Sequence, residues 1–484
     1  MNLRVISRNV GYALLVSALF MFLSVGISLA DGHDSAFGPL LVSALLTSIV
    51  GLFPFIFVRK NSVLSLKDGY LTIVLSWLLS FIFGMLPYAL WGGPFTLENA
   101  WFESVSGFTT TGATILSDIE ALPRSLLFWR SSTHFIGGLG VVVFLLLIIP
   151  NSSPVKLRLT SMELSSLSKD NYSVRSNKTV SIFAYVYLAL FVLAFVAYMI
   201  AGMNPFDAVC HAFSVCATGG FSTRNLSIAA FGSRAVEMVT MVMMLLSSLH
   251  FGLLFLCFAS RSLRPLGNPV IKFYLCSLVL FSFLTGLSLK FTGVENSLGR
   301  ALWDGTFQTL CVASTTGFAI TDNASWPWLP CALLMLLTVM CGCAGSTSGG
   351  VKADRVLLLF KSIGRQINRI LHPSIVNEVK FGSRVLRDEE VSPNILYLAL
   401  YFLLLGVSSL VAVLSGADAH SAFSGSLSSL SNVGPAIREI GFMGNFDAVP
   451  TLAKFTFTLD MFLGRVEIYP VLAVVAMIFD RRNK

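Results

Sequence analysis

The sequence predicts an all-α integral membrane protein of about ten transmembrane helices. Four re-entrant pore half-helices are expected in four pseudo-repeats (span, pore loop, span) around one central pore, preceded by an extra helix pair. Two observations support this fold class. The chain has 484 residues, 55% hydrophobic and only 12% charged, whereas a soluble chain carries about 25% charged residues. Polar, glycine-centred runs also interrupt the apolar sequence four times at nearly even intervals, which indicates a repeated structural unit.

Apolar segments long enough to cross a bilayer occur ten times along the chain. They lie at roughly residues 10–30, 38–58, 70–91, 126–149, 180–202, 236–259, 271–291, 328–343 continuing to about 359, 395–415 and 454–479. The first, Val10–Leu29, ends without a clear small-residue cleavage site, so we interpret it as a membrane helix and not as a signal peptide.

The basic residues are distributed unevenly. Of 33 lysines and arginines, 24 fall in six segments. These are residues 1–8, 59–67, 156–178, 261–272, 352–387 and 481–484. An excess of Lys and Arg on alternate loops marks the cytoplasmic side of a membrane. Both termini are therefore expected in the cytoplasm, and the net charge of +8 indicates topology and no binding of nucleic acid.

Each of four cycles along the chain contains a span, a short amphipathic stretch, a glycine-centred run and a second span. The short stretches are Thr96–Phe108, Pro205–Val215, Ser297–Val312 and Ala419–Leu430. At about 1.5 Å rise per residue they reach only halfway through the bilayer, which predicts re-entrant half-helices. We therefore expect the chain to divide into five segments: the N-terminal helix pair at residues 1–68, and pore repeats at 69–175, 176–265, 266–390 and 391–484.

The glycine-centred runs follow the half-helices directly. They read T-T-T-G-A-T (Thr109–Thr114), C-A-T-G-G-F (Cys216–Phe221), S-T-T-G-F-A (Ser314–Ala319) and S-N-V-G-P-A (Ser431–Ala436). Their expected equivalent glycines, 107, 98 and 117 residues apart, are Gly112, Gly219, Gly317 and Gly434. Polar, irregular backbone at membrane depth is tolerated where protein buries it or where it lines a watery path.

The predicted polarity of the half-helices favours a cation. All four enter from the outer side, so their carboxyl ends, which carry the negative ends of the helix dipoles, point to the membrane centre. Backbone carbonyls held by glycine and small neighbours can replace the water shell of a cation. None of the four runs contains a carboxylate, which argues against a divalent-cation site built from acidic side chains.

With T-T-T-G-A-T in the first loop, A-T-G-G-F-S-T in the second, T-T-G-F in the third and S-N-V-G-P-A in the fourth, the chain resembles the Trk/Ktr/HKT superfamily of potassium transporters. Within it, the sequence is similar to the bacterial Trk-type membrane subunit. The resemblance implies potassium as the transported ion, because glycine is kept in all four loops. It further implies that potassium is bound by a set of filter residues. These are Thr110, Thr111, Gly112, Ala217, Thr218, Gly219, Thr315, Thr316, Gly317, Asn432, Val433 and Gly434.

Two features outside the loops are candidate gating elements. The run G-S-T-S-G-G would break a helix at membrane depth, and Val351 after its last glycine argues against a Walker phosphate loop. A plain glycine-rich kink is the alternative. The resemblance implies an intramembrane gate below the filter. The gate residues are Gly345, Ser346, Thr347, Ser348, Gly349 and Gly350.

Arg465 lies deep in the apolar segment Phe455–Phe479, where a charge costs about 2.5–3.5 kcal/mol or more. It is expected either to pair with Asp460 or Glu467, or to stand in the cation path as an electrostatic barrier. The resemblance favours the barrier. Arg130 and His134 are expected near an outer membrane edge, where their polar ends reach water.

Transport is the expected function, and no catalytic motif for an enzyme is visible. Potassium uptake could be channel-like, or alternatively a symport coupled to protons or sodium. The resemblance implies a bacterial inner-membrane homodimer and a cytoplasmic nucleotide-binding regulatory subunit of the TrkA-like type. Any nucleotide would act only through that partner.

Overall fold

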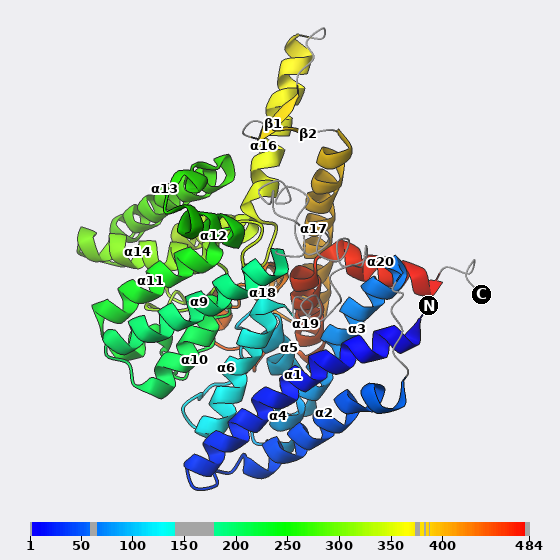
Figure 1. The fold of residues 1–484 in the computed structure, drawn as a ribbon. Coiled ribbons are helices and arrows are strands. Elements are labelled where there is room, and N and C mark those ends of the chain that lie inside the picture. Colours follow the sequence, from blue (N-terminus) through cyan, green and yellow to red (C-terminus); the bar gives the residue numbers. More distant parts are fainter. Residues whose placement is uncertain are drawn as a thin grey trace.

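The protein forms a bundle of helices that includes four short half-helices (Figure 1). The computed structural model describes residues 2–58, 65–140, 179–372, 378–381, 384–386 and 388–479. The helices up to the third cycle are α1 (Leu3–Ala30), α2 (Phe37–Phe57), α3 (Leu66–Gly84), α4 (Leu86–Trp91), α5 (Leu97–Phe108), α6 (Arg124–Leu139), α9 (Thr179–Ile200), α10 (Pro205–Cys216), α11 (Arg234–Ser248), α12 (Phe251–Ser260), α13 (Pro269–Phe291), α14 (Leu298–Ala313), α15 (Trp328–Met340) and α16 (Ala353–Leu371). The remaining helices are α17 (Asp388–Leu414), α18 (Ala419–Ser431), α19 (Thr451–Val466) and α20 (Ile468–Phe479). Short 3₁₀ turns lie at Ser227–Phe231, Arg264–Gly267 and Arg438–Ile440, and strands β1 (Val379–Phe381) and β2 (Arg384–Leu386) pair antiparallel.

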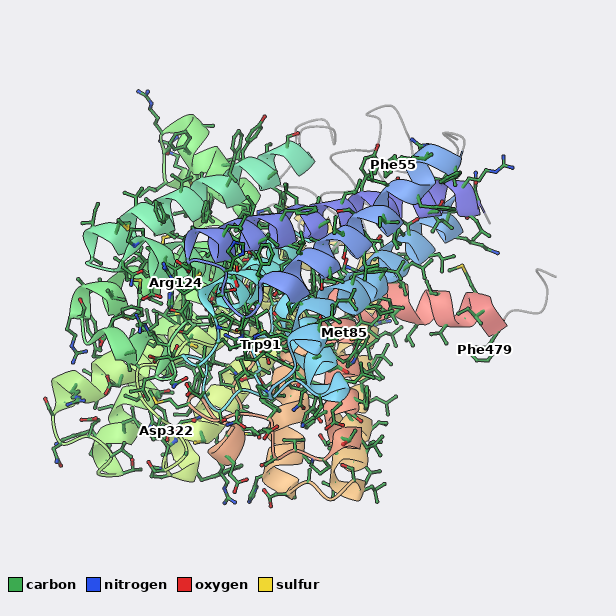
Figure 2. All side chains as sticks on the ribbon, turned by 90° about the horizontal axis from the view of Figure 1, so that it is seen from below. Phe55, Met85, Trp91, Arg124, Asp322 and Phe479 are labelled. Carbon is green, nitrogen blue, oxygen red and sulfur yellow. The ribbon has the colours of Figure 1, made fainter. Side chains whose placement is uncertain are left out.

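The predicted helix pair before the repeats is present as α1 and α2, which lie side by side along one flank of the bundle (Figure 2). Their outer faces carry exposed apolar side chains, among them Ile49, Phe53 and Ile56. At the other side of α1, Asn2 N donates to Asp68 Oδ1 at the start of α3 (2.8 Å). An apolar outer face of this kind is what lipid requires.

The four predicted half-helices are present within one residue of their expected bounds, as α5, α10, α14 and α18. Their starts follow from local sequence. Thr96 accepts from Asn99 N, Asn204 from Asp207 N and Asp418 from His420 N, and such side chains satisfy the free N–H groups of a first helical turn. Their apolar sides pack into the core, so each half-helix is held between two spans.

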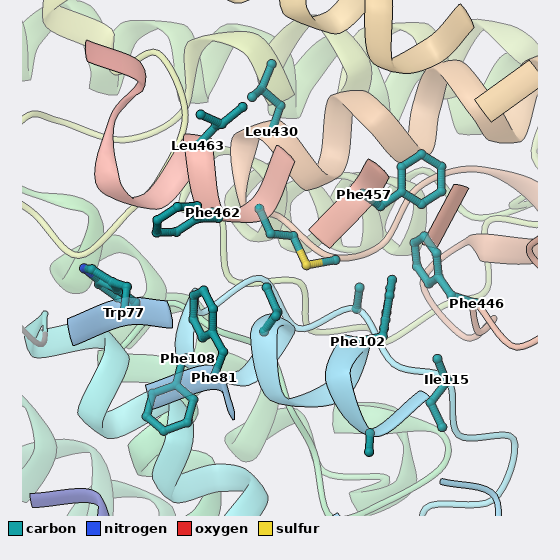
Figure 3. Close-up of a cluster of buried hydrophobic side chains, with 14 of the residues drawn as sticks. Trp77, Phe81, Phe102, Phe108, Ile115, Leu430, Phe446, Phe457, Phe462 and Leu463 are labelled. Carbon is teal, nitrogen blue, oxygen red and sulfur yellow. The ribbon is translucent and has the colours of Figure 1, made fainter. Parts of the chain in front are cut away.

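The first and fourth cycles meet through aromatic packing (Figure 3). Phe102 of α5 lies 5.3 Å, centroid to centroid, from Phe446, and Phe81 of α3 lies 5.7 Å from Phe462 of α19. All four side chains are buried. Residues more than 300 positions apart are thereby held side by side, and the chain of four cycles closes on itself.

In the second, third and fourth cycles, the second span departs from the prediction of one straight helix. Six described helical segments are long and apolar enough to span a membrane: α1, α2, α3 with α4, α9, α13 and α17. The segments predicted at 236–259 and 454–479 are instead bent pairs, α11 with α12 (101°) and α19 with α20 (108°). The predicted span near 328–343 is the short helix α15, followed by irregular backbone up to α16.

Some predictions fall on residues outside the described ranges. These are the end of the 126–149 span, the boundary at 175/176, the basic segments at 156–178 and 481–484, most of the basic segment at 59–67 and parts of that at 352–387. Among the described residues, α16 protrudes from the bundle together with β1 and β2 (Figure 1). Lys361 and Phe381 hold this hairpin against α16 through a cation–π contact of 4.8 Å. The segment boundaries stay predictions.

Candidate functional site

All four half-helices end in the same backbone cap. The second residue after α5, α10 and α14, and the first after α18, takes a left-handed conformation: Thr110 (φ 54°), Thr218 (φ 53°), Thr315 (φ 59°) and Asn432 (φ 56°). The N–H of the next residue bonds to the carbonyl five positions back. These bonds are Thr111 to Ser106, Gly219 to Ser214, Thr316 to Cys311 and Val433 to Ser428, at 2.8–3.0 Å. The pattern is a Schellman cap, which satisfies carbonyls at a helix carboxyl end. Asparagine tolerates this conformation, whereas the β-branched threonine rarely adopts it.

This shared cap fixes the true alignment of the loops. The glycines that follow two positions after each left-handed residue all have positive φ: Gly112 (81°), Gly220 (82°), Gly317 (80°) and Gly434 (94°). The expected alignment of Gly219 with the other three was therefore wrong by one residue. Ala217 is the last helical cap position of α10, and Thr218, Gly219 and Gly220 form the second loop's equivalent of Thr110, Thr111 and Gly112.

The four loops form a closed ring in which each glycine faces a carbonyl of its neighbour. A Cβ placed on Gly112 would lie 2.0 Å from Gly219 O, one on Gly220 2.0 Å from Thr316 O, one on Gly317 2.5 Å from Val433 O, and one on Gly434 2.3 Å from Thr111 O. Real Cβ contacts are far longer, so a side chain at any of these positions would displace a carbonyl. The ring therefore requires glycine for close approach as well as for φ.

In three repeats, a side chain of the half-helix donates a hydrogen bond to the residue that directly follows the glycine of the loop. The donor in each case is the residue that also gives its carbonyl to the cap. These bonds are Ser106 Oγ to Ala113 O (2.6 Å), Cys311 Sγ to Phe318 O (2.9 Å) and Ser428 Oγ to Pro435 O (2.8 Å). The same position thus serves the same purpose in the first, third and fourth repeats, which holds these three loops in equivalent positions.

A cavity of about 70 Å³ opens above the ring. Gly112, Gly220, Gly317 and Gly434 all line it. Arg130 also reaches its wall, together with backbone-rich turns of the fourth cycle around residues 441–446. The ring is therefore accessible from the side on which the half-helices begin.

The Gly345–Gly350 segment lies directly against the opposite side of the ring. The Thr347 hydroxyl is within hydrogen-bond distance of Cys216 O at the end of α10 (3.1 Å), and Gly349 N donates to Thr315 Oγ1 (3.1 Å). A Cβ on Gly349 would lie 2.7 Å from both Ser431 O and Asn432 Oδ1. The segment thus touches the second, third and fourth half-helix ends at once.

Arg465 clamps this segment to the first cycle. Its guanidinium donates to Thr347 O (2.6 Å) and to the carbonyls of Gly137 (2.7 Å) and Gly138 (3.0 Å) at the end of α6. The two acids considered as its partners make other contacts. Asp460 accepts from Ser408 Oγ (2.7 Å), and Glu467 pairs with Arg355.

The pair of Arg355 and Glu467 joins the exit of this segment to the bend between α19 and α20. The guanidinium lies 2.9 Å from Glu467 Oε2 and stacks 4.0 Å above the Tyr397 ring of α17. Glu467 itself has φ 66° at the bend. One side chain therefore connects α16, α17 and α19 immediately below the ring.

Arg130 and His134 do not lie at a membrane edge as expected. Arg130 is 2% exposed and His134 is fully buried, and Arg130 Nε pairs with Glu103 Oε1 at 2.6 Å. The carboxylate at Glu103, inside an amphipathic half-helix, was the available signal for a buried partner. His211 is structural, as its two ring nitrogens lie 2.7 Å from Asp207 O and 2.9 Å from Ser222 Oγ.

Comparison with known proteins agrees with this architecture. Residues 41–483 match the model of the TrkH family, described as a cation transport protein. The Trk system potassium uptake protein TrkH of Halomonas elongata is 34% identical, with 100% of both chains covered. TrkH of Escherichia coli K12 is 32% identical over 99% of this chain and 100% of its own, and TrkG of the same organism is 30% identical over 99% of each.

A solved structure carries the same fold. The crystal structure of the potassium transporter TrkH from Vibrio parahaemolyticus superimposes with a TM-score of 0.89 at 32% identity, and covers 99% of this chain and 100% of its own. The full-length match extends over both halves of the molecule, so it includes the four cycles and the helix pair before them. The chain therefore belongs to the TrkH family of cation transport proteins and is a multi-pass membrane protein of the Trk potassium uptake type.

Proposed function

We propose that this protein takes up potassium through the ring of four loops. The observation that carries the proposal is the closed ring, in which four equivalent glycines each face a neighbour's carbonyl at a distance that excludes any side chain. Carbonyls held at such fixed places can replace the hydration shell of a potassium ion. The relatives' names, which specify potassium uptake, support this ion.

The filter residues of the proposal follow the corrected alignment. Potassium is bound by Thr110, Thr111 and Gly112 in the first loop and by their equivalents in the other three, with Gly220 beside Thr218 and Gly219 in the second. Ala217 lies one position earlier, so its carbonyl belongs to the helix end. The four half-helix dipoles add negative potential at the ring, because their carboxyl ends all meet there.

The Gly345–Gly350 segment and Arg465 act as the gate. The segment rests against three half-helix ends, and Arg465 fixes it to α6. A fixed positive charge at this point repels a cation that leaves the ring, and charges this close interact strongly where water is excluded. Permeation then requires the segment and the arginine to move together.

Orientation follows from the charge distribution along the sequence. The protein lies in the bacterial inner membrane with both termini in the cytoplasm and with the half-helices entering from outside. Potassium then moves inward down its electrochemical gradient. The functional unit is a homodimer with one pore in each subunit. A TrkA-like nucleotide-binding subunit docks on the cytoplasmic face formed by α16 and the β1–β2 hairpin.

Potassium-dependent growth and flux test the proposal. The gene is expressed in a host that lacks potassium uptake, and the purified protein is reconstituted in liposomes with potassium or sodium outside. We expect growth at low potassium, and flux that is larger for potassium than for sodium. Flux that stops when a proton or sodium gradient is collapsed would replace channel-like uptake by symport. Equal flux of the two ions would refute the filter.

A further inference from the structure

Three buried polar side chains lie behind the first two loops. Glu103 of α5 and His134 of α6 are fully buried, and Arg130 of α6 is 2% exposed. They belong to two helices but act on one place, the junction at which Gly112 faces Gly219 O. Buried charges of this kind are costly unless they are paired and hydrogen-bonded.

Glu103 holds the part of the first loop that follows Gly112. Its carboxylate accepts from the Thr114 hydroxyl (3.0 and 3.1 Å) and from Ile115 N (3.1 Å). The same carboxylate accepts from Arg130 Nε at 2.6 Å. The position of the first loop after Gly112 is therefore set by an ion pair with α6.

Arg130 and His134 hold the second loop from the same helix. Arg130 Nη1 donates to Ser222 O (3.0 Å), and its guanidinium lies 3.5 Å from the centre of the Phe221 ring. His134 stacks on that ring at 4.0 Å with an interplanar angle of 15°. A Cβ on Gly219 would lie 2.3 Å from His134 Nδ1, so the imidazole is in direct contact with the backbone of the ring.

The other three junctions are joined differently. Ala319 N donates to Ser227 Oγ (3.2 Å) between the second and third loops. Asn323 Nδ2 donates to Ala436 O (3.1 Å) between the third and fourth. Phe446 N donates to Thr114 O (2.8 Å) between the fourth and first. All of these bonds are between neutral groups. The junction between the first and second loops is held by charged and aromatic groups of α5, α6 and the second loop.

We propose that Glu103, Arg130 and His134 form a rear brace that sets the spacing between the first two loops and thereby the discrimination between potassium and sodium. The inference rests on the proposed function of the ring as a filter. These are positioning residues, because they touch the loops from behind and act on the ion through the carbonyl of Gly219. A packed interior transmits such a shift, since it has few voids that could absorb it.

Removal of the imidazole tests the brace most directly. His134→Ala leaves space behind Gly219, and His134→Phe keeps a flat ring against Phe221. Phe135→Ala is the matched control, because this neighbour on α6 loses a buried ring of similar size that packs on Phe213 of α10 (4.6 Å) and Tyr187 of α9 (5.1 Å). Each full-length variant is reconstituted in liposomes, and the ratio of potassium to sodium flux is measured beside the total potassium flux.

We expect His134→Ala to lower the flux ratio by about tenfold, as small displacements at a site of fixed geometry do. His134→Phe and Phe135→Ala are expected to keep the ratio of the unchanged protein, whatever they do to total flux. A ratio that is unchanged in His134→Ala, or that falls equally in Phe135→Ala, overturns the brace, because a purely structural role would give either result.

A second variant, Glu103→Gln, tests the brace even if His134→Ala does not fold. Glu103→Gln keeps the size of the side chain and removes the charge that pairs with Arg130, so the flux ratio is expected to fall here too, and an unchanged ratio overturns the brace. Gly434→Ser, at the junction between the fourth and first loops, separates the two proposals. A ratio that falls in Gly434→Ser but not in the brace variants leaves the filter intact and removes the brace. A ratio that falls in none of them removes the filter.

Discussion

Arg465→Ala should open the pathway below the ring. The guanidinium donates to three backbone carbonyls, and its bond to Thr347 O, at 2.6 Å, reaches the Gly345–Gly350 segment. The other two, to Gly137 O and Gly138 O, anchor the arginine on α6. The substitution therefore removes one direct bond to the gate and the positive charge beside it.

The size of the effect follows from that single bond. A hydrogen bond from a charged donor contributes about 1.5–3 kcal/mol. If the gate moves between two positions, this loss shifts the equilibrium toward the open one by about tenfold to hundredfold. The lost electrostatic barrier acts in the same direction, so the estimate is a lower bound for the rise in flux.

Potassium flux into liposomes at fixed protein density measures the effect. Arg465→Lys is the control, because it keeps a positive charge and loses the planar fork that reaches two sides at once. We expect high resting flux in Arg465→Ala, and intermediate flux in Arg465→Lys. Unchanged or lower flux in Arg465→Ala, with normal reconstitution, would refute the role of this arginine in gating.

Two further predictions concern contacts near the ring. Thr315→Val removes the hydroxyl that accepts from Gly349 N and should raise resting flux by about fivefold, which corresponds to the loss of one neutral hydrogen bond. The control Thr110→Val, at the equivalent position of the first loop, should leave resting flux unchanged. Equal flux in the two variants would show that the Thr315 hydroxyl does not hold the gate closed. Glu467→Gln breaks the pair with Arg355 and should lower the free energy of unfolding by about 2 kcal/mol, since an uncompensated charge is left in a mostly buried place; thermal unfolding in detergent with no change in the midpoint would contradict this.

Local sequence predicted the half-helices because their starts and ends are set by local chemistry. The capping side chains at Thr96, Asn204 and Asp418 precede amphipathic stretches too short to cross a bilayer. The register of the second loop was missed because C-A-T-G-G-F contains two glycines. Aligning its T-G with the T-G of the first and third loops selects the first of them, Gly219. The cap geometry decides the register, since the left-handed residue is Thr218 and the positive-φ glycine comes two positions later.

The bends in the second spans were not predicted, because each apolar segment stays long enough to span a membrane despite the polar residues at its break, 247–250 and 465–467. Between α11 and α12 the break is held by tertiary bonds. Cys343 N donates to Ser248 O (3.0 Å) and Phe251 N donates to Gly345 O (2.9 Å). Such partners lie about 95 positions away in the sequence and become visible only in the fold. The burial of Arg130 was missed for a related reason, as a buried arginine and one at a membrane edge have the same local sequence.

The central claim is that the ring of four glycines selects potassium. Gly434→Ser tests it most directly, because a Cβ there would lie 2.3 Å from Thr111 O and the carbonyl must move by about 1 Å to relieve the contact. Gly416→Ser is the matched control, since Gly416 also has a positive φ (100°) but no neighbour within 4 Å of its Cβ position.

The measurement is the ratio of potassium to sodium flux in liposomes. A carbonyl displaced from one side of the ring should weaken discrimination by about 1–2 kcal/mol, which is roughly fivefold to thirtyfold in the ratio. The account predicts this fall in Gly434→Ser and no fall in Gly416→Ser. An unchanged ratio in a folded, conducting Gly434→Ser protein would contradict it.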